Sequence, residues 1–219
     1  MKALSFENKA AWLGAKDALL GASEAAAAVG RSKFMSRHEL WEIKTGRKKK
    51  PDISGKPQVQ FGILAEKPLR DLFAVRFNGV YRVSYGGAFD MVQSDRHPWM
   101  VATLDGRLHR RDTDEPGILE VKTTTAHSLA EFRAWLEGPP ETYVWQVRHQ
   151  MNVTGWNYGI ITAGIVLGYL EGEPMEVRDY ALFRDDNADE MAWLEAGEVD
   201  FWQNFVKADR EPPFDFPRI

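Results

Sequence analysis

The sequence predicts an α/β protein in which a mixed central β-sheet is flanked by helices. The order of segments along the chain supports this class: helices come first, then antiparallel strands, then helix, buried strand and helix again. The apolar run over residues 159–167 is typical of a strand buried on both faces of a sheet. We expect the 219 residues to form a single domain, because single domains commonly reach about 200 residues.

The first predicted helices are short. Residues 7–20 place apolar side chains on one stripe of a helix. Ser23 is the expected N-cap of an alanine-rich helix, and a capping box at residues 36–39 opens the next helix. Glycines close these segments, and a basic loop over residues 46–51 follows the last of them.

A longer helix is predicted over residues 58–77. We expect Pro68 to kink or split it, because proline cannot donate the main-chain hydrogen bond of a helix interior. The apolar side chains expected to face the core from this helix are Phe61, Leu64, Phe73 and Phe77.

The middle of the chain alternates strand patterns with turn sequences. Gly86-Gly87, Asp105-Gly106 and Pro116-Gly117 are the turns. The predicted strands are residues 80–83, 99–104, 118–122, 159–167 and 175–183, and the later helices are residues 127–137, 141–154 and 187–207.

Composition excludes several classes of protein. Cysteine is absent, which rules out disulfides and thiolate zinc sites. No apolar run approaches the ~20 residues that a membrane span needs, and the first residues lack the apolar core of a signal peptide. We therefore expect a cytoplasmic protein. The net charge of −4 does not by itself indicate nucleic-acid binding, so basic residues for such a partner would have to be clustered locally.

One pattern of acidic and basic residues suits a metal-dependent active site. Glu120 and Lys122 share one face of a strand, because strand side chains alternate. If this strand pairs with the one before Asp105, the two carboxylates converge and suit a hard cation such as Mg²⁺, with the carbonyl of Val121 as a further ligand. Lys122 would then hold or polarise a water. The alternative is a solvated cross-strand charge pair worth about 0.2–1 kcal/mol, with Asp105-Gly106 as a hairpin turn.

Five short segments occur in an order that resembles a known family. They are GASEAA (21–26), GILAE (62–66), ATLDG (102–106), LEVKT (119–123) and YVWQVRHQM (143–151). Together they make the chain similar to the phage lambda exonuclease family, or YqaJ-type viral recombinases, of the PD-(D/E)XK nuclease superfamily. The likeness spans roughly residues 10–165 and implies a restriction-endonuclease-like core.

The resemblance implies a role for each matching residue of the metal-binding segments. Asp105 and Glu120 would bind Mg²⁺, for which Mn²⁺ could substitute, together with the carbonyl of Val121. Lys122 would orient the attacking water. Glu66 would support a second metal ion or its waters.

The other matching segments are implied to contact the nucleophile and the DNA. Gln146 would contact the nucleophile or a metal-bound water, and Ser23 the phosphate at the cleaved end. The family has an arginine upstream of this serine, where this sequence has Lys16; Arg31 is the other candidate for that role. Lysine binds phosphate as a point charge, without the bidentate fork of arginine. Arg107, close to Asp105 in sequence, is a candidate contact for the DNA backbone.

The function that the resemblance implies is a Mg²⁺-dependent exonuclease. It would digest double-stranded DNA from an end, 5′ to 3′, and leave a 3′ single strand for a single-strand annealing recombinase. A homotrimeric ring around DNA, in a bacterial or phage-infected cell, is also implied. Two alternatives remain open: a PD-(D/E)XK endonuclease that cuts closed circles, and a non-catalytic DNA-binding module with the same fold.

Overall fold

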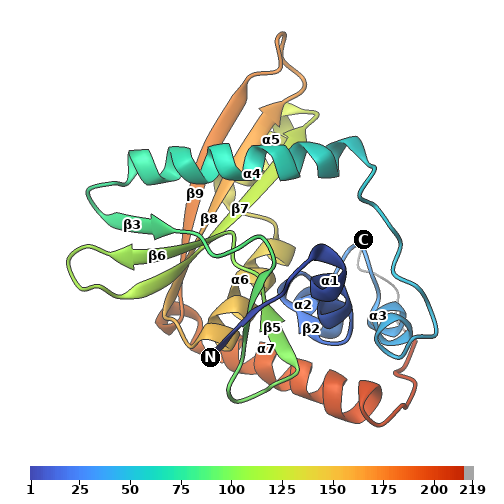
Figure 1. The fold of residues 1–219 in the computed structure, drawn as a ribbon. Helices are drawn as coiled ribbons and strands as arrows, with labels where there is room; N and C mark the ends of the chain where they lie inside the picture. Colours follow the sequence, from blue (N-terminus) through green and yellow to red (C-terminus); the bar gives the residue numbers. More distant parts are fainter. Residues whose placement is uncertain (215–219) are drawn as a thin grey trace.

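A computed structural model describes residues 1–214, which form two β-sheets with helices packed on them (Figure 1). The larger sheet has five strands in the order β3-β6-β7-β8-β9, and the smaller has four in the order β1-β4-β5-β2. Each contains both parallel and antiparallel pairs, which confirms the predicted mixed α/β class. The strands are β1 (Lys2–Ser5), β2 (Leu20–Gly21), β3 (Tyr81–Ser84), β4 (Asp90–Gln93), β5 (Met100–Ala102), β6 (Gly106–Arg110), β7 (Pro116–Ala126), β8 (Tyr158–Leu167) and β9 (Met175–Phe183).

The helices follow the predicted order closely. The later ones, like strand β9, begin and end within a few residues of the predicted bounds. Four strands were not predicted, namely β1, β2, β4 and β6. The helices are α1 (Lys9–Asp17), α2 (Ala25–Ala28), α3 (Arg37–Lys44), α4 (Pro57–Arg76), α5 (Leu129–Glu137), α6 (Glu141–Thr154) and α7 (Ala188–Phe201), with short turns η1 (Ala22–Glu24), η2 (Asp185–Asn187) and η3 (Trp202–Val206).

Strand β7 separates two different layers of helices. Leu119 and Val121 pack with Leu69 and Phe73 of α4 on one face of the sheet. On the other face, Ile118 packs against α6 and α7. Because strand side chains alternate, Glu120 and Lys122 share the face of Ile118 and point towards α6. The predicted division of this strand into an apolar and a charged face is therefore confirmed.

Helix α4 contradicts two of the expectations. It is a single uninterrupted helix through Pro68 (Figure 1), because the main-chain groups that proline leaves unpaired lie on its exposed side, where water can bind them. Phe61 and Leu64 do not face the core, since they are 40% and 74% exposed. The N-terminal half of α4 lies outside the apolar cluster, whereas Phe73 is 1% exposed and packs against Phe77.

This difference within one helix gives a stability prediction. Phe73→Ala is expected to lower the free energy of unfolding by about 3–5 kcal/mol, because it empties a fully packed position. Leu64→Ala on the same helix should change it by no more than about 0.5 kcal/mol. Urea unfolding of both variants tests this prediction. Equal losses in the free energy of unfolding would contradict the assignment of Phe73 to the core and Leu64 to the surface.

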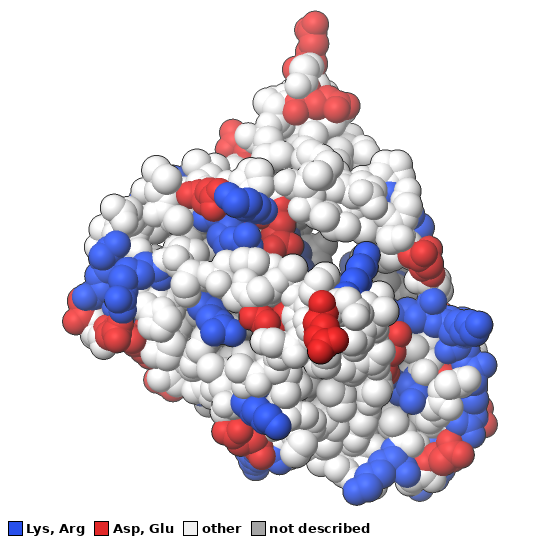
Figure 2. Space-filling view, in the orientation of Figure 1, with Lys and Arg blue, Asp and Glu red and all other residues white. Residues whose placement is uncertain are grey.

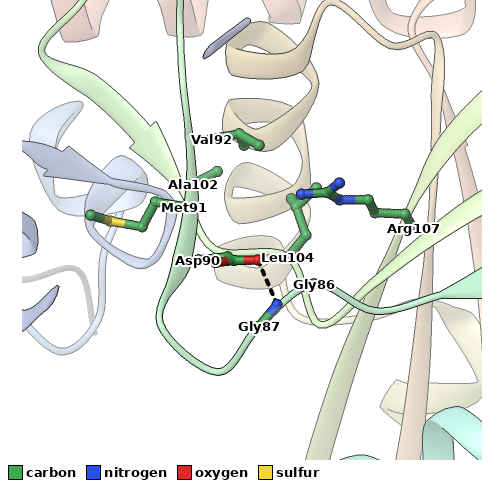
Figure 3. Close-up of a pocket in the computed structure, with 8 residues that line it drawn as sticks. All are labelled: Gly86, Gly87, Asp90, Met91, Val92, Ala102, Leu104 and Arg107. Carbon is green, nitrogen blue, oxygen red and sulfur yellow. Dashed lines mark hydrogen bonds between the residues drawn. The ribbon is translucent and has the colours of Figure 1, made fainter. Parts of the chain in front are cut away.

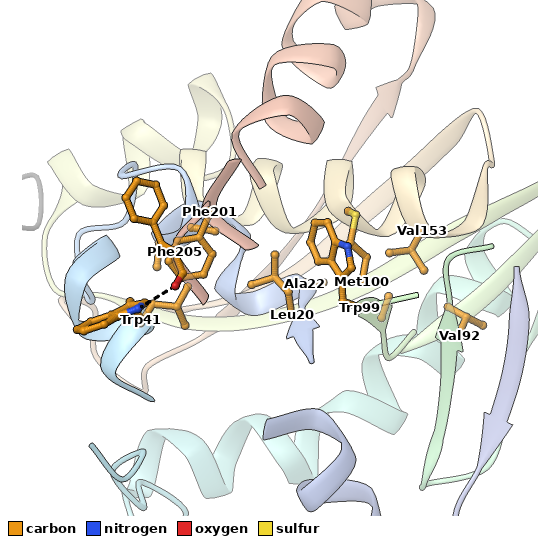
Figure 4. Packing of buried hydrophobic residues seen from close by; sticks show 13 residues of the cluster. Leu20, Ala22, Trp41, Val92, Trp99, Met100, Val153, Phe201 and Phe205 are labelled. Carbon is orange, nitrogen blue, oxygen red and sulfur yellow. Dashed lines mark hydrogen bonds between the residues drawn. The ribbon is translucent and has the colours of Figure 1, made fainter. Parts of the chain in front are cut away.

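A second apolar core holds the segments that lead to the site (Figure 4). Leu20 and Ala22 from β2 and η1 pack with Met100 of β5 and with Phe201, and Trp41 of α3 donates its indole N–H to the Phe205 carbonyl at 3.2 Å. This core fixes the main chain on either side of the Ser23 and Asp105 positions.

Ser23 is not an N-cap. The 3₁₀ turn η1 begins one residue earlier, at Ala22, and Gly21 precedes it. The carboxylate of Glu24 accepts the Gly21 N–H at 3.0 Å, which takes the place of the serine cap that was expected. The Ser23 side chain is exposed. It is therefore available to a ligand.

Among residues 1–214, none of the helices is both long and apolar enough to span a membrane.

Candidate active site

Asp105 occupies the junction between the two sheets. The strand before it, β5, belongs to the small sheet, and β6 begins immediately after it and pairs with β7 in the large sheet. The expectation that the strand before Asp105 pairs with the strand of Glu120 is therefore wrong, and Asp105-Gly106 is not a hairpin turn. The two carboxylates are nevertheless brought together, because Asp105 Oδ2 accepts the N–H of Val121 at 2.8 Å.

Val121 is left without a β6 partner at this point. The register of β6 ends at the pair of Gly106 with Leu119, so the edge of β7 beyond Leu119 faces Asp105 instead of a strand. A strand residue directs its N–H and its C=O to the same side. Since the N–H of Val121 points to Asp105, its carbonyl is directed to the same gap.

Glu120 is held by three side chains. Its Oε1 lies 2.5 Å from the Lys122 ammonium nitrogen and accepts from Gln146 Nε2 at 2.5 Å. Its Oε2 accepts from Gln150 Nε2 at 2.6 Å. Gln146 and Gln150 lie one turn apart on α6, so a single helix face grips both carboxylate oxygens. The Glu120 side chain is only 2% exposed and can hardly change its orientation.

Glu66 reaches the site from the opposite face of the sheet, on α4. Its carboxylate pairs with Arg70 one turn later, at 3.0 Å, and the same guanidinium nitrogen donates to the main-chain carbonyl of Asp105 at 2.5 Å. Arg70 also lies 4.0 Å from the ring centroid of Tyr85, in the loop between β3 and β4. Arg70 therefore ties Glu66 to the chain that carries Asp105.

The site disfavours the charged form of Asp105. Burial raises the pKa of Asp105 well above its ordinary value, and the nearby charge of Glu120 raises it further. For Lys122, burial opposes the charged form, but the carboxylates of Glu120 and Asp105 outweigh it and raise its pKa. The two neighbouring carboxylates thus favour the ammonium form of Lys122.

These residues fit a divalent cation. Asp105, Glu120 and the Val121 carbonyl offer only oxygen donors, as Mg²⁺ prefers, and a cation between the carboxylates would remove the repulsion that raises the Asp105 pKa. The buried Oε1 of Gln150 has no hydrogen-bond partner among the described residues, which suits a ligand water. Within residues 1–214 no three His, Asp or Glu side chains form a metal cluster, so carbonyl and water ligands would have to complete the shell.

A small cavity of about 50 Å³ lies beside Gln146, the side chain that donates to Glu120. Two side chains predicted to bind phosphate, Lys16 and Ser23, line it together with Gln146 and Thr103. Arg31 does not line this cavity, and its guanidinium lies 5.3 Å from the ring centroid of Trp193 on α7. Of the two candidates for the end-phosphate cation, the structure places Lys16 at the site.

Arg107 lies in a separate pocket (Figure 3). This pocket is formed by the glycine-containing loop before β4 and by residues after β5, and Asp90 there accepts the Gly87 N–H. The Arg107 side chain has no hydrogen bond or ion pair with any residue from 1 to 214. It is therefore free for a phosphate contact beside the site, although it does not touch the carboxylates.

An open groove of about 670 Å³ runs beneath the N-terminal half of α4. Phe61 lines it from α4, Thr123–Thr125 and His127 from the end of β7, and Tyr143 from α6. Figure 2 shows a hollow below α4, with basic and acidic side chains near its edge. Lys122 lies 5.0 Å from the ring centroid of Tyr143, so the groove lies next to the site.

Comparison with known proteins identifies the family. Residues 11–157 match the YqaJ-like viral recombinase domain, a range that contains every position described above from Lys16 to Gln150. The chain belongs to this family. It is 28% identical over 204 residues to the uncharacterized protein YqaJ of Bacillus subtilis (strain 168), covering 93% of this chain and 58% of that protein. The chain thus spans little more than half the length of this relative.

Solved structures share the fold of this YqaJ-like domain. The alkaline exonuclease LHK-Exo of Laribacter hongkongensis, also solved with dAMP, superposes with a TM-score of 0.67 at 17% identity over 92% of this chain and 94% of that chain. A phage-related exonuclease from Haemophilus somnus 129PT gives a TM-score of 0.56 at 11% identity over 87% and 96% of the two chains. The restriction-endonuclease-like fold expected from the sequence is confirmed.

Two residues at the site of this YqaJ-like domain, Arg70 and Tyr85, were not identified from the sequence. Arg70 lies four positions after Glu66 on the same helix, so helical spacing would have pointed to it. Gln150, which helical spacing places on the face of Gln146, does reach Glu120. Tyr85 lies in a loop and gives no such signal. His149, in contrast, is fully buried away from the site, bonded to Glu198 at 2.6 Å and to the Val101 carbonyl at 3.0 Å, and is structural.

The grip of Gln150 on Glu120 gives a further prediction. Gln150→Leu keeps the bulk of the side chain and removes its hydrogen-bond donor. Glu120 is then less well oriented and should bind a cation more weakly. Residues that orient metal ligands typically contribute about 10–100-fold to metal affinity, and we expect the dissociation constant of a Mg²⁺ ion at this site to rise by that factor. A magnesium titration measures this, and an unchanged half-saturation point would show that Gln150 does not support the ligand.

Proposed function

We propose that this protein is a Mg²⁺-dependent nuclease that digests double-stranded DNA from its ends, 5′ to 3′. The arrangement of Asp105, Glu120 and Lys122 carries the proposal: two carboxylates and an ammonium group meet beside the first residue of β6. The family of the domain and its fold, shared with alkaline exonucleases, support the same reaction class.

The chemistry proposed is hydrolysis of a phosphodiester. A water oxygen attacks phosphorus, the bond to the 3′ oxygen breaks, and that oxygen takes a proton, which leaves a new 5′-phosphate on the next nucleotide. Bound Mg²⁺ would stabilise the developing charge and lower the pKa of the attacking water. Lys122, held charged by its neighbours, orients the water or a phosphate oxygen as a donor. Glu120 is kept in place by Gln146 and Gln150.

The polarity proposed follows from the cavity beside Gln146. Lys16 and Ser23 offer an ammonium and a hydroxyl to a terminal phosphate, and LHK-Exo, of the same fold, has been solved with a nucleoside monophosphate. The remaining 3′ strand would then pass to a single-strand annealing protein in the cytoplasm of a bacterial or phage-infected cell. A homotrimer around the duplex would keep the enzyme on its substrate.

The test compares linear and closed circular duplexes of one sequence, in Mg²⁺ and in EDTA. Loss of the linear DNA alone, and only in Mg²⁺, is the expected result. Cutting of the circle would favour an endonuclease of the same superfamily. A folded protein that binds DNA and cleaves neither form would be a non-catalytic module and would refute the proposal.

A further inference from the structure

His149 does not touch the site carboxylates, yet it holds the chain that leads to one of them. The imidazole belongs to α6 and is fully buried. Its Nε2 lies 3.0 Å from the carbonyl oxygen of Val101 on β5, and its Nδ1 lies 2.6 Å from the carboxylate of Glu198 on α7. One side chain therefore joins two helices to the strand that precedes Asp105.

Both hydrogen-bond partners of the His149 ring are acceptors. A neutral imidazole has a single N–H and can serve only one of them, whereas an imidazolium donates from both nitrogens. Burial opposes this charge, but the carboxylate of Glu198 outweighs it and raises the pKa of His149. The second oxygen of Glu198 is buried and has no hydrogen-bond partner among residues 1–214, so the ring is the group that compensates this carboxylate.

The hydrogen bond to Val101 is one of a row of three. Alternate main-chain carbonyls along this segment each accept from a side chain: that of Val101 from His149 at 3.0 Å, that of Thr103 from Gln150 at 3.3 Å and that of Asp105 from Arg70 at 2.5 Å. β5 ends at Ala102 and β6 begins at Gly106, so residues 103–105 lie outside both sheets. Side-chain donors therefore take the place of a neighbouring strand in fixing this segment.

Helix α6 fixes the other site carboxylate as well. Gln150 donates to Glu120 and to the carbonyl of Thr103, and His149 holds the same segment two residues earlier. A shift of this segment along α6 would change the separation of the carboxylates of Asp105 and Glu120. Mg²⁺ demands near-ideal octahedral geometry, so its affinity for this pair depends on that separation.

We propose that His149 is a positioning residue that sets Asp105 opposite Glu120, and that Glu198 holds the His149 ring in the orientation that this requires. The inference rests on the proposed function, because it takes a divalent cation to bind between the two carboxylates. It also gives α7 a part in the site, although this helix lies beyond residues 11–157, the range that matches the family.

The test measures the dissociation constant of Mg²⁺ by calorimetry, without DNA. His149→Leu combined with Glu198→Leu removes both members of the pair, a replacement that is often neutral for folding because no buried charge is left unpaired. This double variant should bind Mg²⁺ about tenfold or more weakly than the wild type, within the range typical of residues that orient metal ligands. Thermal unfolding in EDTA checks its fold. An unchanged dissociation constant would overturn the role of His149.

Two further variants separate positioning from a general loss of order. In Glu198→Gln the amide can donate to Nδ1, and the neutral ring then keeps its N–H for Val101, so Mg²⁺ affinity should stay close to that of the wild type. Thr154→Val removes a buried hydroxyl at the end of α6 that donates to the Gln150 carbonyl at 2.8 Å. It should lower stability and leave Mg²⁺ affinity unchanged. A loss of affinity in either variant as large as in the double variant would overturn the positioning role.

Two measurements on the wild type complete the test. Nitrogen-15 magnetic resonance should show both ring nitrogens of His149 protonated at neutral pH, and a ring with one bare nitrogen would contradict the arrangement. A wild type that binds Mg²⁺ but cleaves no DNA would refute the proposed function, yet the binding results would still decide on His149. A wild type that binds no Mg²⁺ would overturn the inference itself.

Discussion

Lys122→Ala is expected to reduce Mg²⁺-dependent cleavage of a linear duplex by about 10²–10⁴-fold, the usual contribution of a positioned proton-transferring or donating side chain. Lys122 is the one ammonium within 2.5 Å of the Glu120 carboxylate among the described residues, and both carboxylates favour its charged form. Its loss removes the donor that would orient the attacking water.

The variant needs a fold check, because it leaves Glu120 without its ion-pair partner. Thermal unfolding in Mg²⁺, where a bound cation would compensate the charge, should show a folded protein, and duplex binding in EDTA should persist. Lys67→Ala is the matched control: Lys67 is an exposed lysine on α4 paired with Asp71, and its removal should leave cleavage unchanged. Full activity of Lys122→Ala would show that the ammonium only neutralises Glu120.

Asp105→Asn is expected to abolish cleavage and, in EDTA, to make the protein more stable. The carboxylate is poorly solvated and lies near Glu120, so its charge is unfavourable without a cation. Asparagine keeps an oxygen for the Val121 N–H and removes the charge. A gain of about 1 kcal/mol would raise the Tm by roughly 2–4 °C in a protein of this size.

The dependence of stability on pH has a definite sign. The folded pKa of Asp105 is raised, so its stabilising protonated form is fully present below the ordinary carboxyl pKa and is lost as pH rises through the raised value. The free energy of unfolding of the metal-free wild type should therefore fall, relative to that of Asp105→Asn, over the pH range in which Asp105 loses its proton. Bound Mg²⁺ should reduce this difference in stability between the two proteins. Calorimetric Tm values across the acid-to-neutral range decide this. A lower Tm for Asp105→Asn in EDTA at neutral pH would contradict the electrostatic account of the site.

Local pattern placed the side chains at the centre of the site, and the order of the family-like segments singled them out. Alternation along a strand places Glu120 and Lys122 on one face whatever the rest of the fold does, and helical spacing places Gln146 and Gln150 on one face of α6. These relations depend on neighbours within a few residues, which is why the structure reproduces them.

The relations that failed depend on distant parts of the chain. Asp105 meets Val121 because the chain changes sheets there, not because the preceding strand pairs with β7. Phe61 and Leu64 obey helical periodicity, but the sheet covers only the later part of α4. Lys50 reaches Glu24 across 26 residues of sequence, and no spacing rule connects a loop lysine with a buried glutamate.

The most direct test of the proposed function is the identity of the first product. A linear duplex carries one 5′-phosphate, labelled on that nucleotide, and one 5′-hydroxyl, and the wild-type protein is added with Mg²⁺ or with EDTA. We predict release of the labelled nucleotide as a 5′-monophosphate, in Mg²⁺ only, with the hydroxyl-ended strand left largely intact. Release from 3′ ends, or cleavage that continues in EDTA, would contradict a metal-dependent 5′ to 3′ exonuclease centred on Asp105, Glu120 and Lys122.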